Sequence, residues 1–285
     1  MNAVWTMAKH TIRECVRRRV FLIVPIATAG FLGLYLLGNH FAFQSVEGRT
    51  TIGGALVDEH ALAGSTLVGL SMFMTLFLAS SLGIFLTFST VRGDAEQGVL
   101  QSLVVRPVAR WGVIAGRFVG ASVICAGYAT FLYAAAVLIT WTTGGWSPTP
   151  LALPWLAMVA AVEVVIALSL LGSTFLNALP NGIGMFMLYG TGLLAGLLSE
   201  LGRVLPSRSL ELTGRVTAWV LPFEALYQAG LNSLTSSARG FTRVVVRLGP
   251  LGGSTPGGPF LGVFAVAYIA AVIALCMWLF ARRDL

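Results

Sequence analysis

The sequence has few charged side chains. Only 10% of its 285 residues are Asp, Glu, Lys or Arg, whereas about 25% is usual for a soluble domain. Apolar residues make up 56% of the chain. This composition excludes an ordinary soluble domain and predicts an integral membrane protein. In such a protein the net charge of +7 serves to orient membrane helices, so we do not expect a nucleic-acid partner.

Cysteine and the common catalytic motifs are also scarce. Cys15, Cys125 and Cys276 are scattered and form no CxxC pair, so neither a disulfide framework nor a zinc site is predicted. The sequence contains no GxxxxGK[ST], GxSxG or HExxH motif. Their absence argues against a nucleotide-binding loop and against the usual membrane hydrolases. The three histidines lie far apart, and no metal site is expected.

Six apolar runs are each long enough to cross a bilayer, for which about 20 residues suffice. An even number of spans places both termini on one side of the membrane. We therefore expect one transmembrane domain over residues 1–285, of the all-α integral membrane class with six transmembrane helices. The runs cover about residues 20–41, 63–90, 112–141, 153–177, 181–199 and 260–281.

Arginine and lysine near the ends of the spans predict the orientation. They gather before the first span, between the second and third spans, and after the last span, and these three segments share one side if all six spans form. Positive flanks stay in the cytoplasm, so both termini are expected to be cytoplasmic. The residues that carry this signal are Lys9, Arg13, Arg17, Arg18, Arg19, Arg92, Arg106, Arg110, Arg282 and Arg283.

Two segments outside the spans have patterns of their own. Residues 1–19 place apolar and basic side chains on opposite faces at helical spacing, which predicts an interfacial amphipathic helix anchored by Trp5. Residues 200–259 are expected to form an external loop, although they are rich in arginine. Within this loop Pro222 and Glu224 argue against a full span, so we expect a re-entrant or a surface-lying helix there.

The insert between the second and third spans, residues 91–111, is polar but has the features of a helix. Asp94 and Gln97 have the spacing of a capping box, and Pro107 disfavours helical geometry at the residue before it. The sequence therefore predicts a short capped helix that ends before Pro107. Its apolar stripe consists of Val99, Leu100, Leu103 and Val104.

Taken in order, these features resemble those of the type-2 ABC transporter permeases. The cytoplasmic insert of that family resembles ExGTLxxLLxxPxxR, although Val99 stands here where the family often has Thr. The N-terminal helix, the six spans, LPFEALYQAGL at 221–231 and the terminal FARRDL are similar as well, so the resemblance covers nearly the whole chain. The motif is met by Glu96, Gly98, Leu100, Leu103, Pro107 and Arg110.

The resemblance implies the permease subunit of an ATP-driven ABC exporter in a bacterial cytoplasmic (inner) membrane. Such a subunit pairs with a second copy, usually as a homodimer, and with ABC ATPase subunits. ATP and Mg²⁺ would bind to the partner ATPase, so this chain is expected to be no enzyme and to bind no cofactor. The insert would be a cytoplasmic coupling helix, with a partner-binding surface formed by Asp94, Glu96, Gly98, Leu100, Leu103, Pro107 and Arg110.

Glu163 is the only acidic residue well inside a predicted span. A charge at that depth is costly, so the side chain must be neutral, paired or exposed to water. It is expected to lie on a translocation path or at a dimer interface, or else to be a protonated Glu bonded to a neighbouring helix. As a proton site it would instead favour an ion-coupled secondary transporter. A non-transporting membrane accessory subunit is the third possibility, and the sequence does not indicate a substrate.

Overall fold

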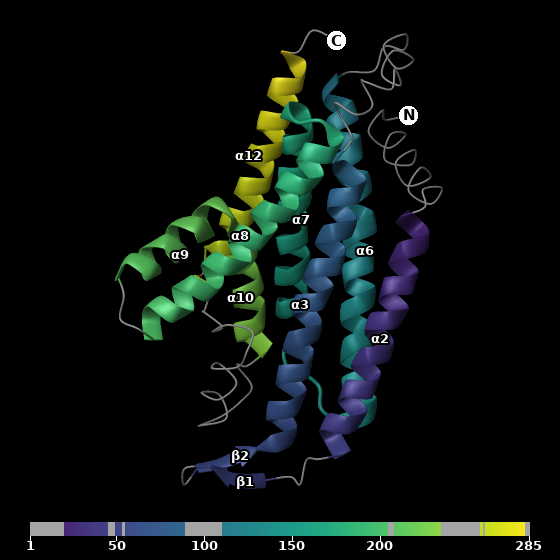
Figure 1. The fold of residues 1–285 in the computed structure, drawn as a ribbon, viewed down its shortest axis with the longest axis vertical. Coiled ribbons are helices and arrows are strands. Elements are labelled where there is room, and N and C mark those ends of the chain that lie inside the picture. The colour runs from purple at the N-terminus through teal and green to yellow at the C-terminus, as the bar shows by residue number, and fades with distance from the viewer. Residues whose placement is uncertain are drawn as a thin grey trace.

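The predicted spans are present in the computed structural model, which describes residues 20–44, 49–52, 55–88, 110–204, 208–234, 257–258 and 260–282. Six helices in these ranges are long and apolar enough to cross a membrane, which confirms a multi-pass membrane protein with α-helical spans (Figure 1). The six are α2 (Val20–Gln44), α3 (Glu59–Thr87), α6 (Arg110–Gly144), α7 (Ala152–Phe175), α8 (Ala178–Val204) and α12 (Leu261–Ala281).

The bundle has two ends, which we name by the features that lie there (Figure 1). At the insert end, α3 ends at Thr87 and α6 begins at Arg110, and the connection from α7 to α8 lies at the same end. The opposite end is the hairpin end, where α3 begins and α6 ends. The predicted insert is therefore attached to one end of the bundle through α3 and α6.

A short antiparallel sheet at the hairpin end was not predicted. Strands β1 (Arg49–Ile52) and β2 (Ala55–Asp58) pair so that Arg49 is opposite Asp58 and Ile52 is opposite Ala55. Helix α3 begins at Glu59, directly after β2. The sheet therefore continues α3 beyond the hairpin end of the bundle.

Helix α7 is central in the bundle and contacts α3, α6, α8, α10 and α12 (Figure 1). Its consecutive residues 164–167 are almost completely buried, as expected for a helix that is apolar on every side. A Cβ atom at Gly83 of α3 would lie 2.7 Å from Cγ1 of Ile166 on α7. The small residue therefore allows α3 and α7 to approach closely.

Two further helices lie within residues 200–259. Helix α9 (Arg208–Val220) runs back along α8, and α10 (Pro222–Leu234) turns into the bundle and packs on α7 (Figure 1). Most residues of α10 are buried. With 13 residues it is about 20 Å long, which is too short to cross a hydrocarbon core of about 30 Å. The helix is therefore part of the bundle without being a span.

Several predicted features lie outside the described residues. They are the interfacial helix at 1–19, the insert from 91 to 109, and the part of the predicted external loop from 235 to 256. Of the predicted coupling residues, only Arg110 falls within a described element, as the first residue of α6. Those outside are Asp94, Glu96, Gly98, Leu100, Leu103 and Pro107.

Candidate functional site

A cluster of polar groups joins three helices at the insert end, next to the point where the predicted insert begins. Asn181, in the first turn of α8, donates from Nδ2 to the backbone oxygens of Phe88 and Ser169, each at 3.1 Å. The hydroxyls of Thr87 and Ser169 are hydrogen-bonded at 2.8 Å. We call Thr87, Phe88, Ser169 and Asn181 the insert-end cluster. It ties the end of α3 to α7 and α8.

The insert-end cluster is enclosed by protein. The Thr87, Ser169 and Asn181 side chains are each no more than 1% exposed, so the loss of one partner would leave a buried polar group unsatisfied. Gly172 on α7 leaves room for the Asn181 side chain, because a Cβ atom at position 172 would overlap Oδ1 of Asn181. A displacement of the α3 end would therefore be passed directly to α7 and α8.

Helix α6, on the other side of the insert, also packs closely. Gly112, Gly116 and Gly120 follow one another at four-residue spacing, and all three are buried. Small residues at this spacing let helices approach closely. Helix α6 contacts α3, α7 and α2, so both helices that flank the insert pack in the bundle.

Glu163 on α7 pairs with α6 of the same chain. Ser122 donates a hydrogen bond from Oγ to Oε2 of Glu163, and the Glu163 side chain is half-buried. The bond links the third and fourth spans. The sequence left several arrangements open for Glu163. The contact observed is a hydrogen bond to a neighbouring helix.

A second acidic side chain is buried in the bundle, which the sequence alone does not indicate. Glu224, in the first turn of α10, is only 6% exposed, and its Oε1 accepts a hydrogen bond of 2.9 Å from Nε2 of Gln228. Burial raises the pKa of the Glu224 carboxyl to about 7. From the sequence, Pro222 and Glu224 predict a re-entrant or surface-lying helix within residues 200–259, but they do not indicate that the carboxyl group is buried.

The face of α8 opposite Glu224 is shaped to receive α10. A Cβ atom at Gly192 would overlap the Phe223 ring, and one at Gly196 would overlap the Glu224 carboxyl group. The Phe223 ring also stacks on Tyr189 of α8, with ring centroids 5.3 Å apart. Two glycines one turn apart were the sequence signal for this contact, since they indicate a close neighbour without identifying it.

The environment of Glu224 is rich in polar groups that lack hydrogen-bond partners. Among the described residues none bonds to Oε2 of Glu224, Oε1 of Gln228, or the hydroxyls of Tyr189 and Tyr227. The Tyr227 ring also packs against Phe73 of α3. No three or more His, Cys, Asp or Glu side chains in the described ranges are grouped to hold a metal ion.

A family model described as ABC-2 family transporter protein matches residues 5–285. No curated protein matches the sequence. The matched range includes every described helix, the predicted insert and the segment that contains α9 and α10.

Proposed function

Because the family model covers nearly its whole length, the chain belongs to the ABC-2 family of transporter proteins, and from this premise we propose that it is the permease subunit of an ATP-driven exporter. Family membership and the six spans make it a membrane permease of an ABC transporter. The proposal adds the direction of transport, coupling to a separate ATPase, and the arrangement in the membrane.

The observation that supports coupling is the position of the insert. Its two attachment points, the α3 end at Thr87 and the α6 start at Arg110, lie at the same end of the bundle. The insert-end cluster binds the first of these points to α7 and α8. A force applied to the insert would therefore act on four spans at once.

In the proposed mechanism the ATPase carries out the chemistry and this chain transmits the movement. The apolar stripe of the insert docks on the ATPase, which binds ATP and Mg²⁺, and closure of the ATPase pair displaces the insert. The displacement moves α3 and α6, and Asn181 passes it on to α7 and α8. Both termini and the insert face the cytoplasm of a bacterial inner membrane in this arrangement, and α10 is a re-entrant helix.

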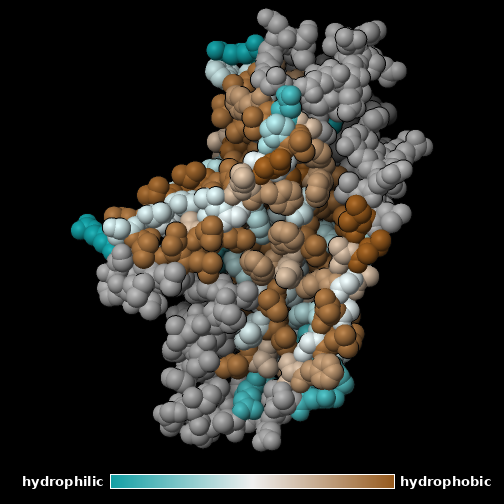
Figure 2. Space-filling model, viewed as in Figure 1, coloured by the Kyte–Doolittle hydropathy of each residue, from teal (hydrophilic) through white to brown (hydrophobic). Residues whose placement is uncertain are grey.

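A second copy of the chain completes the translocation path in this proposal. Apolar side chains cover much of the face shown in Figure 2. Among the described helices, α2 packs mainly on α3 and α6. Cβ atoms at Gly30, Gly33 and Gly38 of α2 would meet no other atom within 4 Å. Since small residues favour close helix contacts in membranes, α2 is the surface we propose for the homodimer. Glu163 is bonded to Ser122 within one chain, which supports a role in helix pairing.

Co-purification with the ATPase tests the proposal. The full chain, extracted in mild detergent from the cells that naturally produce it, is expected to retain an ABC ATPase subunit. Replacing both Leu100 and Leu103 by Asp should remove it, because the substitutions place charge on the apolar stripe. The matched control replaces Gln101 and Ser102, which lie off the stripe, by Asp. If both double variants retain the ATPase, or if both lose it, docking through the stripe is contradicted.

A further inference from the structure

Two polar side chains in the contact between α8 and α10 are bonded to each other on one side only. Glu224 and Gln228 are each 6% exposed, and their four-residue spacing places them on one face of α10. Nε2 of Gln228 donates to Oε1 of Glu224 at 2.9 Å. The second oxygen of each side chain, Oε2 of Glu224 and Oε1 of Gln228, is buried and has no hydrogen-bond partner among the described residues. We call these two side chains the acid–amide pair.

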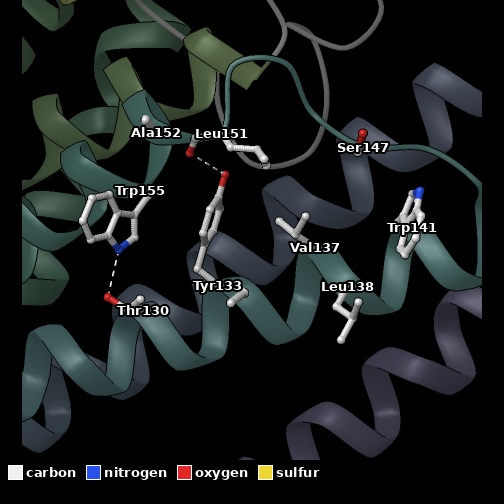
Figure 3. A pocket seen from close by; sticks show the side chains of 10 residues that line it. Thr130, Tyr133, Val137, Leu138, Trp141, Ser147, Leu151, Ala152 and Trp155 are labelled. Carbon is white, nitrogen blue, oxygen red and sulfur yellow. Dashed lines mark hydrogen bonds between the residues drawn. The ribbon is translucent and has the colours of Figure 1, made fainter.

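Unpartnered oxygens of this kind need an explanation, because polar groups inside proteins are usually hydrogen-bonded. The polar groups between α6 and α7 show the usual arrangement. Nε1 of Trp155 donates to Oγ1 of Thr130 at 2.8 Å (Figure 3). The Tyr133 hydroxyl donates to the backbone oxygen of Leu151 at 3.2 Å (Figure 3). In the acid–amide pair two neighbouring oxygens lack a donor, which is costly for buried groups, so a hydrogen atom between them would stabilise the pair.

The carboxyl group of the pair also lacks a positive partner. Its Oε1 accepts from an amide, and its Oε2 accepts from nothing in the ranges that the structure describes, so no described Arg, Lys or His bonds to it there. A carboxylate buried without a partner is much costlier than a neutral carboxyl group, and such a group holds a proton instead. A proton on Glu224 would therefore remove the charge and supply the missing hydrogen at the same time.

The position of the proton depends on which neighbour accepts it. The hydroxyls of Tyr189 and Tyr227 also lack partners. A tyrosine hydroxyl can donate as well as accept, however, so one within reach of Oε2 would already be bonded to it. An amide oxygen only accepts, and two acceptors that face each other bond only when one of them carries a hydrogen. Oε1 of Gln228 is thus the acceptor, since the bond at 2.9 Å already holds the amide against the carboxyl group.

We propose that the acid–amide pair is a proton-binding site, in which Oε2 of Glu224 holds the proton and donates it to Oε1 of Gln228. One proton then satisfies both unpartnered oxygens, and two hydrogen bonds join the side chains instead of one. Gln228 is the positioning residue, because its amide orients the carboxyl group and receives the proton. Gly196 of α8 leaves room for the carboxyl group, which a Cβ atom there would overlap. The site requires neither a direction of transport nor an ATPase.

Infrared spectroscopy of the full chain in phospholipid vesicles tests for the proton, because a protonated carboxyl group has a C=O stretching band that an ionised one lacks. At pH 6 the wild type should show a protonated-carboxyl band that is lost in Glu224→Gln. Glu163→Gln is the matched control, since it alters the carboxyl group bonded to Ser122 and should leave the Glu224 band in place. If Glu224→Gln keeps the full band of the wild type, Glu224 is ionised and the proposal is wrong.

Removal of the amide tests the acceptor. In Gln228→Leu the carboxyl group loses both hydrogen bonds, so the Glu224 band should shift to higher wavenumber. Tyr227→Phe removes a hydroxyl from α10 without changing the acid–amide pair, and it should leave the band unshifted. Gln228→Met serves if the Leu variant does not fold. An unshifted band without the amide, or an equal shift in Tyr227→Phe, would overturn the proposal.

Discussion

The Nδ2 atom of Asn181 lies 3.1 Å from the backbone oxygen of Phe88, and this hydrogen bond holds the end of α3 against the beginning of α8. Phe88 is the last described residue before the predicted insert. The same Nδ2 atom also bonds to Ser169 of α7. One side chain therefore connects the element that would receive force to two helices of the membrane bundle.

Replacing Asn181 by Ala should uncouple the permease from its ATPase. The substitution removes the side-chain donor from the backbone oxygen of Phe88, at a cost of about 1–3 kcal/mol, and leaves the oxygen of Ser169 with only its bond within α7. We expect a complex that still assembles but whose ATP hydrolysis no longer responds to the permease, together with a lower thermal denaturation temperature. ATPase assays of the complex in vesicles measure the first effect.

The control for this prediction is Thr191→Ala on the same helix. Its hydroxyl is exposed and bonds only to the backbone of its own helix, at Met187. This variant should keep both coupling and stability. If Asn181→Ala lowers stability but leaves the ATPase response intact, Asn181 is a packing residue and the proposed transmission route is wrong.

Gly196→Ala should loosen the contact between α8 and α10. The added methyl group would overlap the Glu224 carboxyl group, and overpacking of a tight contact costs about 1–3 kcal/mol. Gly190→Ala, also on α8, is the matched control because its methyl group would meet no atom within 4 Å. Thermal denaturation in detergent should show a loss for the first variant only. Equal stability of the two would mean that α10 does not pack on α8 in this way.

The spans were predictable because each is one continuous apolar run, and the bilayer fixes the length that such a run needs. The sheet before α3 also had a signal, since Gly53 and Gly54 separate two short segments, as in a two-residue hairpin. The insert-end cluster could not be predicted. Asn181 resembles any polar residue at the start of a span, and only the fold shows that it faces Phe88 and Ser169.

The burial of Glu224 could not be predicted from the sequence, for a different reason. By composition alone, a 13-residue helix that contains a carboxyl group is as typical of a loop as of a helix bundle. Its position is decided by space on its neighbours, which Gly192 and Gly196 provide from a distant part of the sequence. Long-range complementarity of this kind is not visible in one segment.

Glu163→Gln distinguishes helix pairing from ion coupling. A glutamine side-chain oxygen can still accept the hydrogen bond from Ser122, so a pairing role predicts unchanged stability and ATPase response. Glu163→Leu removes the acceptor, and we expect it to lower the denaturation temperature. An ion-coupled transporter would instead need the carboxyl group itself. Proton flux into vesicles that contain the chain without any ATPase, abolished by Glu163→Gln, would support that alternative against the exporter.

Glu224 should make stability depend on pH. In the unfolded chain a glutamate has a pKa of about 4.3, whereas burial raises the pKa of Glu224 in the folded protein to about 7. Below the lower value both states are protonated and the pKa shift costs nothing. Between the two values the unfolded chain loses its proton while the folded protein keeps it, so stability falls by about 1.4 kcal/mol per pH unit. Above the higher value the loss is constant.

Comparison of the wild type with Glu224→Gln isolates this effect. Glutamine keeps the acceptor for Gln228 but does not titrate. The facing Tyr227 stays neutral in this pH range, because burial raises its pKa further from its usual value near 10. Between pH 5 and pH 8 the denaturation temperature of the wild type should therefore fall relative to that of Glu224→Gln. Parallel pH profiles would show that the carboxyl is ionised or solvated in the folded protein, and α10 would then not be seated in the bundle as described.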